Sequence, residues 1–309
     1  MSQVVKKKKN QIILRICRDK YLLLMLFPVI LHYVVFSYLP MYGITLGFKD
    51  YSVKAGILGS PWVGFKYMKQ FFSSVYLGRL FRNTLEINII SLVIGFPIPI
   101  LFALALNEIE VGPFKKTIQT ISYFPYFIST VIVVALIAFF CHPTNGIFMK
   151  VFKLLGYKGK NLLIETWMYR PLFIGSGIWQ NFGWNSIIYL SAMTAVDPGV
   201  YEAATIDGAT RIQRARHITI PGILPTVVMV LIINIGGLFS LGADKVLLLY
   251  NDSTREVADV FSTYVFRCGI QNSEFSYATA VGLFNSVCNL ILLSITNTIA
   301  KMATGISLW

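Results

Sequence analysis

A small set of tryptophan and asparagine side chains lies within long apolar stretches of the sequence. Its members are Trp179, Asn181, Trp184, Asn234 and Asn285. Amides donate and accept the hydrogen bonds that hydroxyl groups require, and an indole offers a flat apolar surface on which a sugar ring can stack. Asparagine also forms hydrogen bonds between helices inside membranes. The set therefore indicates either a path for a polyhydroxylated solute or interhelical packing.

Residue types that support catalysis or metal binding are scattered. His32, His142 and His217 lie far apart, and none has a second ligand at metal-binding spacing. Lys158-Gly159-Lys160 lacks the spacing of a phosphate-binding loop. No acid, base and nucleophile converge in a way that an enzyme needs. We expect no catalytic residue and no metal site, and a membrane-embedded enzyme is the alternative from another functional class.

The segment 197–221 is a polar island between two apolar stretches. Asp197-Pro198 is typical of a helix start, because a carboxylate caps the helix and proline suits its first position. Small and apolar residues then recur at spacings of three and four, which predicts one helical face formed by Ala204, Gly208, Ile212 and Ala215. Such a face lets another backbone approach closely and suits a groove on a partner. An ordinary amphipathic loop helix is the alternative.

This spacing resembles the cytoplasmic coupling motif of permeases in bacterial ATP-binding-cassette (ABC) importers. The motif runs Glu-Ala-Ala, three residues, Gly, nine residues, Ile, one residue, Leu-Pro. The matching residues are Glu202, Ala203, Ala204, Gly208, Ile218 and Pro221. Ile220 replaces the leucine, and Ala215 stands where an aromatic residue is common. The resemblance implies that the matching residues, together with Asp207, couple this chain to an ATP-binding subunit.

Further segments resemble the carbohydrate-importer branch of this family. They are residues 62–65, 71–72, 83–85, 236–238, 244–251, 277–286 and 305–309. Several of them resemble a subgroup of permeases for oligosaccharides derived from complex polysaccharides, including pectin and alginate fragments. The resemblance implies a type I ABC importer permease fold and oligosaccharide import by alternating access. The alternative within transport is the same type of importer permease for another polar solute, such as a glycerol phosphate or a peptide.

The resemblance also implies partners. These are a second homologous permease subunit, two ATP-binding-cassette subunits and an extracytoplasmic solute-binding lipoprotein. ATP and magnesium would be bound by the partner subunits, and this chain would bind no cofactor. A stand-alone channel would leave the coupling segment without a purpose.

Long stretches without charge must position these groups. Hydrophobic residues make up 55% of the chain, and charged residues are 13% against a typical quarter. The stretches that lack Lys, Arg, Asp and Glu are residues 21–48, 87–107, 117–149, 171–196, 217–243 and 275–300. Each exceeds the ~20 residues that cross hydrocarbon as a helix. We therefore predict an all-α polytopic membrane protein with six transmembrane helices, in a domain over residues 21–309 that follows a basic segment over residues 1–20.

Basic residues cluster before the first apolar stretch, at Lys6–Lys9, Arg15, Arg18 and Lys20. Such a cluster holds its end of the chain in the cytoplasm. Six spans then place both termini and the segment 197–221 on the cytoplasmic side of a bacterial cell membrane. The net charge of +13 fits contact with anionic lipid. It does not indicate nucleic acid, because no basic stripe with interleaved aromatic residues is present.

Further expectations concern charge and thiols. Basic residues outnumber acidic ones in the predicted outer segments, which would attract an anionic oligosaccharide. No arginine lies in the middle of a span, so we favour a neutral or mixed oligosaccharide inside the pathway. Glu86 is expected to pair with Arg82, four residues before it. Cys141 and Cys268 fall at predicted outer ends, where we expect unpaired buried thiols, with a disulfide as the alternative.

Overall fold

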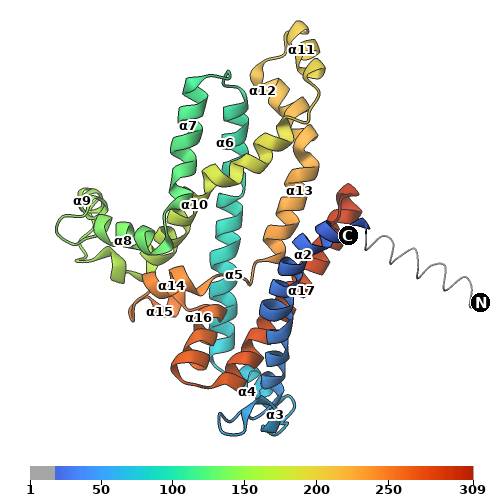
Figure 1. Ribbon diagram of the computed structural model, residues 1–309. Coiled ribbons are helices and arrows are strands. Elements are labelled where there is room, and N and C mark those ends of the chain that lie inside the picture. Colours follow the sequence, from blue (N-terminus) through green and yellow to red (C-terminus); the bar gives the residue numbers. More distant parts are fainter. Residues whose placement is uncertain (1–17, 309) are drawn as a thin grey trace, which may run out of the picture.

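Helices make up the part of the chain that the structure describes. The computed structural model describes residues 18–308, which contain no β-strand, so the predicted all-α class is confirmed. The predicted basic segment lies almost wholly outside the described residues, as do Cys17 and Trp309. Two groups of short helices mark opposite ends of the molecule in Figure 1. One end carries α11 (Pro198–Ile206) and α12 (Arg211–Arg214), and the other carries α3 (Gly56–Gly59) and α4 (Lys66–Phe72).

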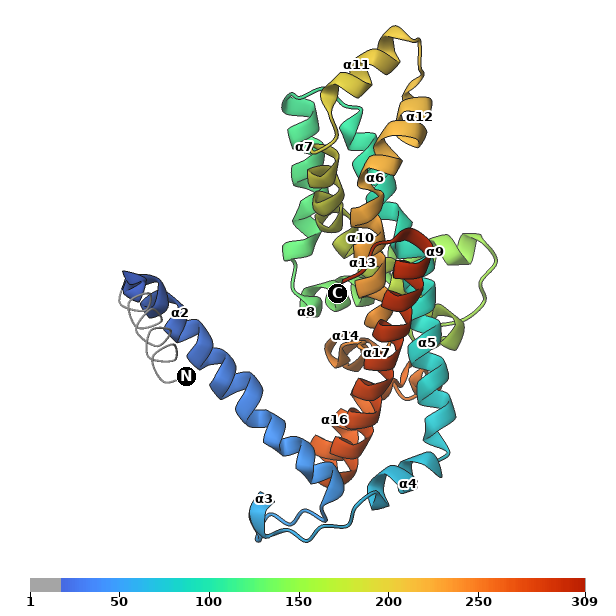
Figure 2. The same cartoon turned by 90° about the vertical axis from the view of Figure 1, so that its right-hand side faces the viewer.

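The first apolar stretch, Lys20–Phe48, stands apart from the rest of the subunit. It consists of α2 (Lys20–Tyr33), the π-helical η1 (Val34–Tyr38) and the 3₁₀-helical η2 (Leu39–Phe48). None of its apolar window is buried, and α2 diverges from the other helices in Figure 2. Only its end reaches α17 (Phe275–Thr304), where a Cβ on Gly47 would lie 3.2 Å from the backbone nitrogen of Ala280. Glycine therefore permits this close crossing.

A bundle of long helices forms the body of the subunit. It consists of α5 (Tyr76–Gly95), α6 (Pro97–Asn107), α10 (Thr166–Met193), α13 (Ile220–Gly236) and α17. Near the end that carries α11, one buried cluster packs between α6, α10 and α13, and its members are Ala103, Tyr189, Met193 and Ile223. Lipid is as apolar as these side chains, so close packing holds the helices together.

The predicted span over residues 117–149 is wrong as a single straight helix. The chain forms α7 (Pro113–Tyr123), η3 (Phe124–Phe127) and α8 (Thr130–Phe140), with a bend of 98° between the two arms. Pro125 lacks the N–H that would continue an α-helical ladder. Ser129 then caps the new helix by accepting the N–H of Ile132 at 3.5 Å.

The number of membrane spans is not fixed by helix length and composition. Among the described residues, four stretches are long and apolar enough to cross a membrane, namely Lys20–Phe48, Tyr76–Asn107, Arg211–Gly236 and Phe275–Thr304. The bent pair would be a fifth. The helix α10 has 28 residues, enough to cross, but it carries several amides and glycines and is not among the strongly apolar stretches. The count of six therefore stays a prediction.

The second span begins earlier than predicted. The helix starts at Tyr76 instead of residue 87, and Arg79 and Arg82 in its first turns each have an acidic partner. Arg82 Nε lies 2.7 Å from Glu86 Oε1, which confirms the predicted pair, and Arg170 of α10 lies 2.5 Å from Glu86 Oε2. The carboxylate thus joins α5 to α10 as well as pairing within its own helix.

The segment before α4 is held by polar contacts. An isolated antiparallel bridge joins Lys49 to Trp62. The carboxylate of Asp50 accepts a hydrogen bond from the Tyr67 hydroxyl at 2.6 Å and one from Lys66 Nζ at 3.1 Å. These bonds hold the pKa of the Asp50 carboxyl below its usual range, with the hydroxyl of Tyr67 the larger cause. This segment includes residues 62–65, which resemble the carbohydrate-importer branch.

Further short helices complete the subunit. They are α9 (Ile147–Leu154), η4 (Leu162–Ile164), α14 (Ala243–Leu249), α15 (Arg255–Ala258), α16 (Phe261–Phe266) and η6 (Arg267–Gln271). Asp259 is fully buried between them and is bound by Arg267 at 2.6 Å and by the Thr263 hydroxyl at 2.7 Å. Cys141 and Cys268 are buried and free, as we expected.

Candidate functional site

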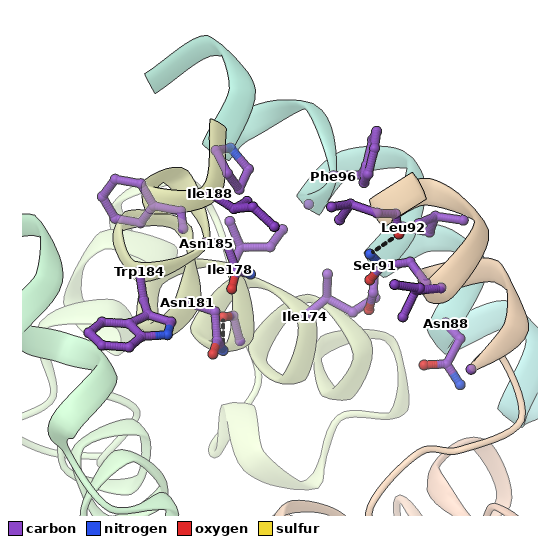
Figure 3. A pocket seen from close by; sticks show the side chains of 18 of the residues that line it. Asn88, Ser91, Leu92, Phe96, Ile174, Ile178, Asn181, Trp184, Asn185 and Ile188 are labelled. Atoms are coloured by element: carbon purple, nitrogen blue, oxygen red, sulfur yellow. Dashed lines mark hydrogen bonds between the residues drawn. The ribbon is translucent and has the colours of Figure 1, made fainter. Parts of the chain in front are cut away.

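A large cavity opens between the helices of the bundle. Its volume is about 1110 Å³, and α5, α6, α10 and α13 contribute its walls. Figure 3 shows Asn181, Trp184 and Asn185 projecting from α10, with Asn88 and Ser91 on the α5 side. Aliphatic side chains supply most of the remaining wall, together with the rings of Phe96, Phe173, Phe182 and Tyr189. The cavity therefore combines flat apolar surfaces with amide and hydroxyl groups.

Three of the five predicted pathway residues meet in this cavity. Asn181, Trp184 and Asn234 line it, whereas Trp179 and Asn285 do not. The Nδ2 of Asn181 donates to the Gly177 carbonyl at 2.8 Å, and the Nδ2 of Asn234 donates to the Val230 carbonyl at 2.7 Å. Each amide thus uses its N–H₂ group within its own helix. Its carbonyl oxygen is left to accept a hydrogen bond from a ligand hydroxyl.

Trp184 is held in place by two other aromatic residues. Its ring stacks on Tyr126 with the centroids 4.5 Å apart and the planes 5° from parallel. Phe127 approaches it edge-on at 5.5 Å. Because 38% of Trp184 remains exposed, part of the indole is free to contact a ligand while the stacked neighbour fixes its orientation.

Asn285 has the geometry of a packing residue. Its Nδ2 donates to the Phe239 carbonyl at 3.1 Å, which ties α17 to the chain after α13. Its Oδ1 is buried and has no hydrogen-bond partner. Trp179 lies outside the cavity wall and is 43% exposed. Asn285 thus has a contact of the interhelical kind that the sequence left open as the alternative, and Trp179 stays outside the cavity wall.

Several polar cavity residues were absent from the predicted set, among them two asparagines and a lysine. Asn88 and Asn185 were missed although both lie in or beside predicted spans. Asn88 donates to the carbonyls of Thr84 at 3.0 Å and Leu238 at 2.7 Å, so it also joins α5 to the end of α13. Lys245 was assigned to an outer segment, but α14 folds back and places it in the cavity wall. In the sequence, Lys245 follows an apolar stretch almost directly, and this is only a weak indication that its side chain lines the cavity.

The segment 197–221 forms a helix, a tight turn and a second helix. Asp197 caps α11 by accepting the N–H of Gly199 at 2.9 Å, which confirms the predicted helix start. The predicted continuous face through Ala215 is wrong, because Gly208 has a φ of +78° and ends the first helix. Thr210 then begins α12 with a capping box to Gln213.

This helical turn presents both a hollow and exposed apolar side chains. A hollow of about 320 Å³ is lined by Ala204, Asp207, Gly208 and Ile218 together with Arg214 and His217. Ile206 is 87% exposed and Ile212 is 80% exposed on the same turn. Glu202, Ala203 and Pro221 are exposed as well. The turn therefore exposes two large apolar side chains beside a small hollow.

Polar contacts tie this turn to the transmembrane helices. Arg214 donates to the Thr205 hydroxyl at 2.9 Å and to Glu108 Oε2 at 3.3 Å, just beyond the end of α6. Tyr201 and Thr219 share a hydrogen bond of 2.8 Å, which joins α11 to η5 (Ala215–Thr219) before α13. These contacts join the turn to α6 and α13, and both of these helices contribute to the cavity wall.

No cluster in the described residues offers the ligands for a metal ion, since no three His, Cys, Asp or Glu side chains converge there. The three histidines remain in separate parts of the structure, on α2, after α8 and on η5. The polar groups that do converge are amides, hydroxyls and one ammonium in the cavity. Their arrangement suits the binding of a polar solute.

Comparisons with known proteins show which proteins this chain is similar to. The chain is 43% identical to the polygalacturonan/rhamnogalacturonan transport system permease protein YteP of Bacillus subtilis (strain 168), over 96% of this chain and 92% of that protein. It is also 43% identical to the protein LplB of the same bacterium, over 92% of this chain and 89% of LplB.

A solved structure is similar along its whole length. A chain of a bacterial ABC transporter involved in the import of the acidic polysaccharide alginate is 38% identical, with a TM-score of 0.86 over 95% of this chain and 99% of that one. The type I importer permease fold implied by the sequence is thereby confirmed. The family described as binding-protein-dependent transport system inner membrane component matches residues 95–302. This chain belongs to that family, as a membrane-embedded transporter permease and not an enzyme.

Proposed function

We propose that this chain is a permease subunit that carries oligosaccharides across the cytoplasmic membrane by alternating access. The observation that supports this most directly is the cavity of about 1110 Å³ with amide and aromatic walls. Pockets for small ligands usually measure ~300–1,000 Å³, so this space is large enough for more than one sugar ring. Relatives named for polygalacturonan/rhamnogalacturonan transport and for alginate import support an oligosaccharide as the solute.

The walls match the chemistry of a sugar chain. Aromatic faces at Trp184 and Phe96 can stack on the apolar faces of pyranose rings. Asn181 and Asn234 present free carbonyl oxygens to sugar hydroxyls. We place Trp179 and Asn285 outside the direct contact set, because neither lines the cavity.

We propose that α11 and the turn at Gly208 dock on an ATP-binding subunit. The hollow beside Gly208 and the exposed Ile206 and Ile212 give this end an apolar surface of small extent. Glu202 lies at its exposed edge, where it can make a polar contact. Movement of the docked turn reaches the cavity through the Arg214–Glu108 and Tyr201–Thr219 contacts. ATP and magnesium belong to the partner subunits in this arrangement.

The assembly contains further partners. A second homologous permease would complete the pathway and cover the first apolar stretch, since none of its apolar window is buried in its own chain. Two ATP-binding-cassette subunits would bind the two coupling turns. A solute-binding lipoprotein would deliver the oligosaccharide, in keeping with a solved relative that is in complex with an alginate pentasaccharide-bound periplasmic protein.

The proposed orientation places α11 and both chain ends in the cytoplasm. In Figure 2, the starting end of α2 and the final end of α17 both point toward the side where α11 lies. The basic residues before α2 support the same orientation. The helices α3, α4 and α9 would then face the outside, where the solute-binding protein docks.

Purification of the chain with its native partners tests this function. In mild detergent, two ATP-binding-cassette subunits and a second permease should copurify, and the reconstituted complex should take up a labelled oligosaccharide only with ATP and the loaded binding protein. Ile206→Glu should weaken the copurification of the ATP-binding subunits, since it places a charge on the apolar surface that α11 is proposed to dock with. Leu58→Glu is the matched control, because Leu58 is 82% exposed at the opposite end. Uptake without ATP, or a preparation without ATP-binding subunits, would contradict the proposal.

A further inference from the structure

Lys245 is the one charged residue that lines the cavity in the part of the chain that the structure describes. Its Nζ donates to the Phe173 carbonyl at 2.8 Å and lies 4.7 Å from the centre of the Phe173 ring. Gly177 lies beside it, and a Cβ built there would stand in ordinary van der Waals contact, 3.4 Å from the Nζ. The ammonium is therefore positioned by α10 and directed to the cavity.

This ammonium has no acidic partner. None of the ion pairs among residues 18–308 includes Lys245, so no carboxylate oxygen of these residues lies within 4.0 Å of its Nζ. An ammonium has three N–H donors, and the Phe173 carbonyl occupies one of them. A partly buried charge without a counter-charge is costly, which makes the cavity favourable to an anion.

The position of Lys245 places this charge in one half of the cavity. The helix α10 runs from Thr166 toward the segment 197–221, so Phe173 and Gly177 lie at the end far from α11. In the proposed orientation this is the outer end, where a solute enters. Asn88 lies in the same half, because its Nδ2 donates to the Leu238 carbonyl just after α13.

We propose that Lys245 binds a carboxylate of an acidic oligosaccharide, so that the cavity prefers uronate-containing chains to neutral ones. The proposal rests on the importer function proposed above and adds the substrate class and the residue that selects it. It replaces the expectation of a neutral or mixed solute, which rested on the lack of an arginine within a span. A lysine delivered by α14, outside the predicted spans, supplies the charge instead.

The size of the effect follows from the type of contact. A hydrogen bond between charged groups contributes enough to change affinity roughly tenfold to a hundredfold. A methyl ester of the same sugar chain keeps its length and hydroxyl pattern but lacks the negative charge. The ratio of acid uptake to ester uptake therefore reports the contribution of the ammonium.

The test uses the whole complex in proteoliposomes, supplied with the binding protein loaded with a trigalacturonate or with its methyl ester. Calorimetry first sets equal loading of the two. The wild type should import the acid faster than the ester. Lys245→Met should lower the acid-to-ester ratio roughly tenfold or more, and Lys245→Arg should restore most of it. Lys69→Met is the matched control, since it removes an exposed lysine of α4, and its ratio should equal that of the wild type.

Two results would overturn the proposal. One is an unchanged ratio in an assembled Lys245→Met complex. The other is equal import of acid and ester by the wild type, which needs no variant and so applies even where substitution at Lys245 prevents assembly. A wild-type complex that imports no oligosaccharide bound by its binding protein would instead refute the importer function, so the two failures can be told apart.

Discussion

The turn at Gly208 offers the sharpest test of the docking geometry. Its φ of +78° lies in the left-handed region, which costs a residue with a Cβ roughly 1–2 kcal/mol. No heavy atom lies within 4 Å of a Cβ built on Gly208, so a side chain there meets open space within the subunit. Two separate effects can therefore be measured at one position, the strain in the backbone and the bulk presented to a partner.

Three substitutions separate these effects. Gly208→Asn should cost least, because asparagine tolerates the left-handed region. Gly208→Ala adds the full strain of roughly 1–2 kcal/mol, which lowers the population of the native turn by a factor of about 5–30 relative to a competing loop conformation. Gly208→Trp adds the same strain and also a side chain that must enter the partner surface. Any loss beyond that of alanine measures the docking contact.

The assay is oligosaccharide uptake and ATP hydrolysis stimulated by the loaded binding protein, both normalised to the amount of assembled complex. We expect uptake to fall in the order Asn, Ala, Trp, with the tryptophan variant also weakening copurification of the ATP-binding subunits. Equal losses for Ala and Trp would show that only the backbone conformation matters. Normal uptake with Trp would refute docking through this turn.

Three further predictions follow from the remaining contacts. Trp184→Ala should reduce uptake at least severalfold, because Trp184 lines the cavity, whereas Trp179→Ala should not; the reverse result in uptake assays would move the pathway to another face of α10. Arg214→Ala and Glu108→Ala should each uncouple ATP hydrolysis from uptake. A double-mutant cycle should give a coupling energy of about 1 kcal/mol between the two side chains, and additive effects would exclude a direct interaction between them. Cysteine labelling should reach residues 50–78 and 145–168 from outside and residues 199–215 only after permeabilisation; outside labelling at residue 202 would reverse the orientation.

The sequence predicted the helical bundle and the family because those signals are long or specific. An apolar stretch of membrane length is visible without knowledge of its neighbours, and the coupling motif is a fixed combination of residue types. The break at Gly208 was also within reach, since a glycine after a helix is the usual residue for a left-handed cap. It was missed because the small-residue spacing of three and four continued through it.

Part of the cavity was predictable from helical periodicity alone. Trp184 and Asn185 follow Asn181 at spacings of three and four residues, which places them near its face of the helix. Trp179 is two residues from Asn181 and so points to the other side. Periodicity cannot say which face meets a cavity, and for Asn285 that depends on how α17 packs against the chain after α13. Lys245 required the fold itself, because only the return of α14 onto α10 brings it to the cavity.

The separation of α2 from its own bundle has a consequence for how the sequence can change over time. A helix satisfies its backbone hydrogen bonds internally and is stable in lipid without neighbours, so this span can insert before the rest of the chain is synthesised. None of its apolar window is buried in the subunit, and a substitution between apolar residues there alters no internal packing. The constraint on these residues comes from the bilayer and from other chains, and not from the subunit's own core. Sequence drift in the first span should therefore outpace drift in α10, where a change of one methylene is felt by tightly packed neighbours.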